Sequence, residues 1–238
     1  MFFDFLRTIW QDVRMNIVPY CRLPLSKQKR LLDLFLTGST ARAAARVVGV
    51  NRMTGILFFR KLRLQIWIYR RLIQRRKIKG VIEVDECYTT GGEGGREARK
   101  QGRNLRGKIA LVGCISRGTR HVHIERVQDT KETTLTDFIA RNTTPSVIHT
   151  DCFKGYARLA RRGYRHLRVN HFVHYKNFDT GACTNLIESV WSGVKRHWHR
   201  FNGGYRNNLD LWITEAELRA ESGVKNLPKA LKRILRRK

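Results

Sequence analysis

The sequence predicts an α/β protein in which a small all-α region precedes a larger domain built around a sheet. Three observations support this prediction. Residues 26 to 62 place apolar side chains at helical spacing. From Gly80 onward, short β-type runs alternate with helical segments. Two of these runs, Val81–Asp85 and Ser146–Asp151, each end in an aspartate.

Three helices are predicted in the all-α region. Apolar residues follow the capping residues Ser26, Thr40 and Asn51, which are typical first residues of helices. Glycines end the first two helices, at Gly38 and Gly49. The third helix runs on through a basic and apolar segment.

Two helices joined by a glycine turn are typical of a helix-turn-helix DNA-binding unit, and an ordinary three-helix bundle shows the same pattern. The charges favour DNA, because Arg52 and Arg60 lie on the third helix and a basic linker follows at residues 69–79. We therefore predict a helix-turn-helix domain at residues 24–68. It follows an N-terminal extension of unknown role at residues 1–23.

The first predicted strand carries the first candidate site residue. Val81–Asp85 combines β-branched residues with a preceding glycine, which indicates a short buried strand with Asp85 at its carboxyl end. Open α/β sheets present ligand-binding groups at this end of their strands. A glycine- and arginine-rich stretch follows and predicts a mobile basic loop, in which Arg96, Arg99 and Arg103 are candidates for contact with the DNA backbone.

Further strands and helices follow, which together with the first strand give the order βββαβαβ. The predicted ranges are strands at 108–116 and 120–127, a helix at 133–141, a strand at 146–150, a short helix at 154–162 and a strand at 166–169. Asp151 directly follows the fourth strand, so the two aspartates meet if their strands are neighbours. A final helix then carries Glu188 and Lys195 on one face, opposite an apolar face.

Positive charge dominates the composition: 48 Lys and Arg stand against 19 Asp and Glu, a net charge of +29 in 238 residues. Such a surplus favours DNA or RNA as partner, because each neutralised phosphate releases counterions. Converging carboxylates from Asp85, Asp151 and Glu188 would hold a divalent metal beside phosphate, since Mg²⁺ prefers oxygen ligands. The remaining acids of these segments are assigned to structural or solvent positions: Glu83, Glu86 and Glu125.

The cysteines predict a reducing environment. All five are widely spaced and none forms a C-x-x-C pair, so neither a disulfide framework nor a zinc ribbon is indicated. Charges interrupt the apolar N-terminus, which argues against a signal peptide, and no stretch approaches a membrane span. His171 and His174, with Cys152, Cys183 or His149, offer a rival zinc site, although their spacing matches no strong ligand pattern.

An ordered set of motifs resembles a known family. The runs VIEVDECYTTGG, IHTDCFKGY, VNHFVHY and TNLIESVWSGVKRHWHRFNG resemble the DDE transposases of bacterial insertion sequences in the ISXO-like group, relatives of the eukaryotic Merlin elements. The earlier run LLDLFLTGSTARAAARVVGVN is similar to the N-terminal region of the same group. Together they cover about residues 26 to 220, and the first 23 residues fall outside.

The resemblance implies an RNase H-like mixed-sheet catalytic domain, which we place at residues 80–222. We expect a basic C-terminal tail at residues 223–238. It also implies that Asp85, Asp151 and Glu188 form the catalytic and metal-binding triad, with Mg²⁺ or Mn²⁺ as cofactor. Lys195 matches the family's basic residue, seven positions after the glutamate. Asn185 is the alternative third catalytic residue.

The expected function is that of a transposase. It would bind the terminal inverted repeats of an insertion sequence, cleave the DNA and join the 3′ ends to target DNA, as a homodimer or larger homo-oligomer in the prokaryotic cytoplasm. Two alternatives stay open: an RNase H-fold nuclease or resolvase, and a catalytically inactive DNA-binding regulator derived from a transposase.

Overall fold

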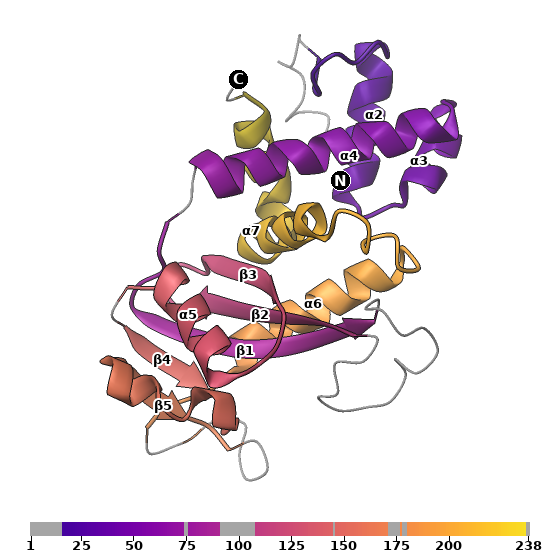
Figure 1. Cartoon of the computed structure of the whole chain (residues 1–238). Coiled ribbons are helices and arrows are strands. Elements are labelled where there is room, and N and C mark those ends of the chain that lie inside the picture. Colours follow the sequence, from indigo (N-terminus) through magenta and orange to yellow (C-terminus); the bar gives the residue numbers. More distant parts are fainter. Residues whose placement is uncertain are drawn as a thin grey trace. The chain divides into compact units, whose positions relative to one another are not determined.

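The computed structural model describes residues 16–73, 76–90, 108–144, 146–170, 177 and 180–236 (Figure 1). The chain divides into two compact units, one made of residues 1–75 with 214–238 and the other of residues 76–213. Several predicted residues lie outside the described part of the chain: Arg96, Arg99, Arg103, His171 and His174.

The first unit contains α2 (Leu25–Leu36), α3 (Ala41–Val48), α4 (Arg52–Ile68), the π-helical turn η1 (Tyr69–Ile73) and most of α7 (Leu209–Arg236). Thr40 and Asn51 are confirmed as caps, because their side chains accept from the N–H groups of Ala43 and Met53 at 3.2 and 2.8 Å. The predicted cap at Ser26 is wrong. The N-cap is Pro24, and Ser26 lies inside the first turn of α2.

The C-terminal residues form a helix instead of the predicted basic tail. α7 bends at Gly223 and continues to Arg236. Its apolar residues recur at helical spacing and are buried in the same core as α2 and α4: Leu227, Leu231, Ile234 and Leu235. Burial of this apolar stripe explains why the segment folds despite its charge.

The predicted basic linker at residues 69–79 is also different in the structure. Arg70 lies in η1 and is only 5% exposed, because it pairs with Glu217 and Glu221 of α7 at 2.8 and 2.7 Å. Arg63 of α4 is likewise buried against Glu215 at 2.6 Å. These arginines are internal ion-pair partners and cannot serve as phosphate contacts.

The second unit contains a five-stranded mixed sheet in the order β3-β2-β1-β4-β5. The strands are β1 (Val81–Thr90), β2 (Lys108–Ser116), β3 (Val122–Val127), β4 (Val147–Thr150) and β5 (Arg165–Arg168). The first three pair antiparallel, while β4 runs parallel to both β1 and β5. This α/β arrangement is compatible with an RNase H-like domain.

Helices cover both faces of the sheet, α5 (Glu132–Asn142) on one side and α6 (Asn185–His199) on the other (Figure 1). Side chains of α5, including Phe138, share a core with Val84 and Val112 of the sheet. The apolar face predicted for α6 is buried: Ile187, Trp191, Val194 and Trp198. Two 3₁₀ turns, η3 (Lys154–Tyr156) and η4 (Leu159–Arg162), replace the short helix predicted at 154–162.

Strand β1 is longer than predicted. The sequence places Asp85 at its carboxyl end, but β1 continues to Thr90 because it pairs with β2 from Ile82 to Thr90. Asp85 therefore lies in the middle of a strand. None of the helices in the described ranges combines the length and apolar character that a membrane crossing requires.

Candidate active site

Two aspartates lie on neighbouring parallel strands. In the β1–β4 register, Ile82 stands opposite Ile148 and Glu83 opposite His149. The same register, continued by two residues, brings Asp85 level with Asp151, the residue after the end of β4. Adjacent strands are separated by about 4.8 Å, so this register brings the two carboxylates into one neighbourhood.

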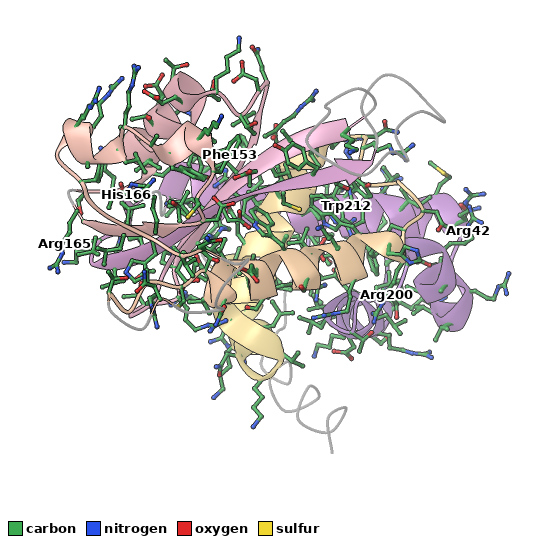
Figure 2. All side chains as sticks on the ribbon, turned by 90° about the horizontal axis from the view of Figure 1, so that it is seen from below. Arg42, Phe153, Arg165, His166, Arg200 and Trp212 are labelled. Atoms are coloured by element: carbon green, nitrogen blue, oxygen red, sulfur yellow. The ribbon has the colours of Figure 1, made fainter. Side chains whose placement is uncertain are left out.

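The turn after β4 holds Asp151 through the backbone. Its Oδ1 accepts from the N–H of Phe153 at 2.9 Å, and Phe153 is labelled in Figure 2. The buried Thr150 hydroxyl donates to the carbonyl oxygen of Asp151 at 2.6 Å and lies 2.9 Å from Nε2 of His166. Burial lowers the pKa of His166 to about 4, so the neutral ring can donate to Thr150 and brace this turn.

Electrostatics connect the predicted acids. Burial, together with the negative charges of Glu86, Asp151 and Glu188, raises the pKa of Asp85 from 3.8 to about 8. A hydrogen bond from the backbone N–H of Glu86 lowers the pKa of Asp85. Like charges have this effect only at short range, so Asp151 and Glu188 lie near enough to Asp85 to act on its charge, as does its strand neighbour Glu86.

Glu188 lies in the first turn of α6. Its Oε1 accepts from the hydroxyl of Thr184 at 2.7 Å, which orients the carboxylate. Asn185 is the exposed first residue of the same helix. Of the two candidates for the third catalytic residue, Glu188 is the one whose charge acts on Asp85.

Gly113 allows α6 to lie close to the sheet at this level. It stands opposite Asp85 in the β1–β2 register. A Cβ atom added there would lie 2.7 Å from the ring of Trp191 and 3.2 Å from Cδ1 of Ile187. An isolated glycine inside a predicted strand is a known sign of such close approach, and it was available in the sequence.

We expect Gly113→Ala to destabilise the second unit by about 1–3 kcal/mol, because the added methyl group must displace the ring of Trp191. Urea unfolding followed by circular dichroism measures the change. Gly193→Ala is the matched control, since a Cβ there meets no atom within 4 Å and alanine favours a helix interior. Equal stability of the Gly113 variant and the wild type would contradict the packing argument.

Two acids that the sequence assigned to structure or solvent lie beside the cluster. Glu83 is 1% exposed and accepts from the N–H groups of Leu186 and Ile187 at the start of α6. Glu86 accepts from the hydroxyl of the fully buried Tyr156 at 3.1 Å. Burial, together with Glu86 and Asp85, raises the pKa of Tyr156 well above its usual value, so its hydroxyl stays a donor.

Lys195 lies on the same side of the sheet as Asp85. Its ammonium group hydrogen-bonds the thiol of Cys87, which projects from the same face of β1 two residues after Asp85. Burial raises the pKa of Cys87 to about 11, and Lys195 partly opposes this shift. α6 therefore brings both a carboxylate and a cation to this face.

The carboxylates suit a divalent cation in their chemistry. Among the described residues, no group of three or more His, Cys, Asp or Glu side chains is already arranged closely enough to hold a metal ion. Asp85, Asp151 and Glu188 nevertheless supply the hard oxygen donors that Mg²⁺ and Mn²⁺ prefer. Besides burial, the negative charges of Asp151 and Glu188 contribute to the raised pKa of Asp85, and a bound cation would neutralise this repulsion.

The remaining predicted contact residues lie in the first unit. Arg52 and Arg60 are both exposed on α4, the helix after the Gly49 turn. Their side chains are therefore accessible to a partner.

Comparison with known proteins places most of this chain in one family. Residues 77–220 match the family described as the ISXO2-like transposase domain. The chain is also similar to an uncharacterized transposase-like protein of Haemophilus influenzae. The two are 30% identical over 112 residues, which make up 46% of this chain and 89% of that protein.

Proposed function

The chain belongs to the ISXO2-like transposase family, and we propose that it cleaves DNA at the ends of an insertion sequence and joins the freed 3′ ends to target DNA. The observation that carries this proposal is the β1–β4 register, which brings Asp85 level with Asp151 on neighbouring strands of a mixed sheet. Glu188 reaches the same neighbourhood from α6. The order of the strands supports an RNase H-like domain as the scaffold.

Asp85, Asp151 and Glu188 would hold Mg²⁺ or Mn²⁺. When bound, such ions activate the attacking oxygen and stabilise the leaving oxygen of an in-line displacement at phosphorus. The chain's own residues prepare the site. The N–H of Phe153 fixes Asp151, and the hydroxyl of Thr184 orients Glu188. Lys195, which hydrogen-bonds the Cys87 thiol, would turn to contact a phosphate.

We assign DNA-end recognition to α3 and α4 as a helix-turn-helix unit. The support is the pair of capped helices around Gly49, with φ of 67°, and the exposure of Arg52 and Arg60 on α4. Double-stranded DNA is then the partner, both as terminal inverted repeat and as target. Pairing of two element ends would require at least a homodimer.

A labelled duplex that carries the element's own end tests this function. We expect nicking in Mg²⁺, followed by a joined product, and no reaction in EDTA. Cleavage without joining would favour a nuclease or resolvase. Binding without cleavage in any metal would favour a DNA-binding regulator.

Metal affinity is expected to depend on pH. Because the pKa of Asp85 is about 8, a proton competes with the metal below that pH. The affinity for Mn²⁺, measured by electron paramagnetic resonance, should rise by up to about tenfold per pH unit from pH 6 to pH 8 and level off above it.

The stability of the metal-free protein, in contrast, should fall as pH rises. The native state keeps a proton on Asp85 that the unfolded chain releases near pH 3.8. This contribution to stability is complete below about pH 4 and is lost as pH rises to about 8. A Mn²⁺ affinity that stays constant from pH 6 to pH 8 would contradict this account of the site.

A further inference from the structure

We propose that Glu83 is a positioning residue: its buried carboxylate caps α6 from strand β1 and thereby holds Glu188 in place beside Asp85. This inference rests on the proposed function, which makes Glu188 the third catalytic acid.

The first turn of α6 is not capped by the side chain of its own N-cap residue. The N-cap residue Thr184 makes no side-chain capping bond. N–H groups in the first turn of a helix have no partner within the helix and need one from outside when they are buried. Oε2 of Glu83 accepts from both Leu186 and Ile187, at 2.7 and 3.0 Å, across 103 and 104 positions of sequence. The cap is therefore a tertiary contact between sheet and helix.

The capping carboxylate is held rigidly. Its side chain is 1% exposed, so water does not compete for its oxygens. A negative charge at a helix N-terminus is favourable, and hydrogen bonds to a charged acceptor are stronger than neutral ones. Oε1 lies 3.7 Å from Nε of Arg117 and accepts from the thiol of Cys183 at 3.6 Å. Both oxygens of Glu83 thus have partners.

The cap acts on the site through geometry. Side chains two residues apart on a strand project from the same face, so Glu83 and Asp85 share the face of β1 that α6 covers. The capped residues Leu186 and Ile187 directly precede Glu188. Because Glu83 performs the capping, the hydroxyl of Thr184 is used to orient Glu188 instead. Glu83 therefore fixes the position of α6, and Thr184 orients the carboxylate of Glu188.

Hydrogen exchange on the full-length protein tests the cap itself. In Glu83→Ala, the amides of Leu186 and Ile187 should exchange at least about tenfold faster, because they lose their acceptor. Glu83→Gln should show a smaller increase, since its amide oxygen still accepts an N–H. Glu125→Gln is the matched control. It removes a carboxylate from the same sheet, one that bonds Arg141 and Asn142 of α5.

Two further measurements connect the cap to the site. We expect Glu83→Ala to weaken Mn²⁺ binding about 10-fold and to slow cleavage at saturating DNA about 100-fold, with the Kd for DNA unchanged. Glu83→Gln should recover part of both losses. A residue that only stabilises the fold would leave the cleavage rate of the folded variant at the wild-type value.

Wild-type exchange at residues 186 and 187 in a folded Glu83→Ala protein would overturn the proposal. If Glu83→Ala fails to fold, Glu83→Gln serves as the test. Wild-type exchange at residues 186 and 187 in Glu83→Gln, together with a wild-type cleavage rate, would equally overturn the proposal. A wild-type protein that neither binds Mn²⁺ nor cleaves DNA would instead remove the proposed function. The exchange data would still test whether Glu83 caps α6.

Discussion

Asp85→Asn and Asp151→Asn are expected to abolish DNA cleavage and joining while leaving DNA binding intact. Each amide keeps the size of the side chain but loses the negative charge that a divalent cation needs. Loss of several kcal/mol of transition-state stabilisation corresponds to a fall of at least about 10³-fold in the cleavage rate, since 1.36 kcal/mol is tenfold. A gel assay on a labelled element end measures both products.

Stability gives an independent readout for the same variants. The pKa of Asp85 is raised to about 8, so its ionised form is unfavourable in the metal-free fold. Asp85→Asn should therefore match the wild type below about pH 4, and its advantage in stability should grow as pH rises to about 8 and stay constant above it. Loss of activity would then not be attributable to unfolding.

Controls for this prediction come from the same unit. Asp137→Asn changes an exposed acid on α5 and should leave the cleavage rate unchanged. Glu188→Gln should resemble the two aspartate variants, whereas Asn185→Ala should not, because Glu188 is the one whose charge acts on Asp85. Full activity of Asp85→Asn would exclude the proposed catalytic role. Full activity of Glu188→Gln with an inactive Asn185→Ala would transfer that role to Asn185.

Arg70→Met is expected to destabilise the first unit by about 3–5 kcal/mol. Burial alone would lower the pKa of Arg70, but the charges and hydrogen bonds of Glu217 and Glu221 raise it above its ordinary value. The arginine therefore stays charged inside the unit. Its removal leaves the negative charge of Glu217, which is 0% exposed, buried without its contact to Arg70, while Arg71 stays 3.0 Å away.

The double variant Arg70→Met with Glu217→Met separates pairing from packing. It should recover most of the loss, because apolar side chains of similar volume often replace a buried ion pair at little cost. Arg71→Met is the control. Arg71 is 24% exposed and should contribute no more than about 1 kcal/mol. Hydrogen exchange in α4 and α7 reports on this unit alone. A loss below about 1 kcal/mol for Arg70→Met would contradict the prediction.

Local signals in the sequence identified most elements of secondary structure. The caps Thr40 and Asn51, the αL turn at Gly49 and the strand at 108–116 depend on residues within a few positions of one another, so the sequence was sufficient. The same holds for the two faces of α6. The segment that contains Asp85 was recognised as a strand, but its far end was not, since residues 86–90 owe their strand conformation to pairing with β2.

The candidate site shows the same division. Asp85, Asp151 and Glu188 were identified from strand and helix patterns and from motifs, whereas Glu83 and Glu86 were assigned to structure or solvent. The partners that reveal these two glutamates, the first turn of α6 and the hydroxyl of Tyr156, lie 103 and 70 positions away in sequence. A glutamate on a strand gives no indication by itself of which distant backbone it will cap.

The sequence by itself determined the charge of the protein, the order of its elements and the acids that its family implies. Only the tertiary structure decided which charges are internal. Arg70 belongs to a run that looks like a solvated basic linker, yet it pairs with Glu217 across 147 positions of sequence. Composition reports how many charges a chain carries, but burial depends on the contacts between distant segments. The functional surface of so basic a protein therefore had to be determined from its fold.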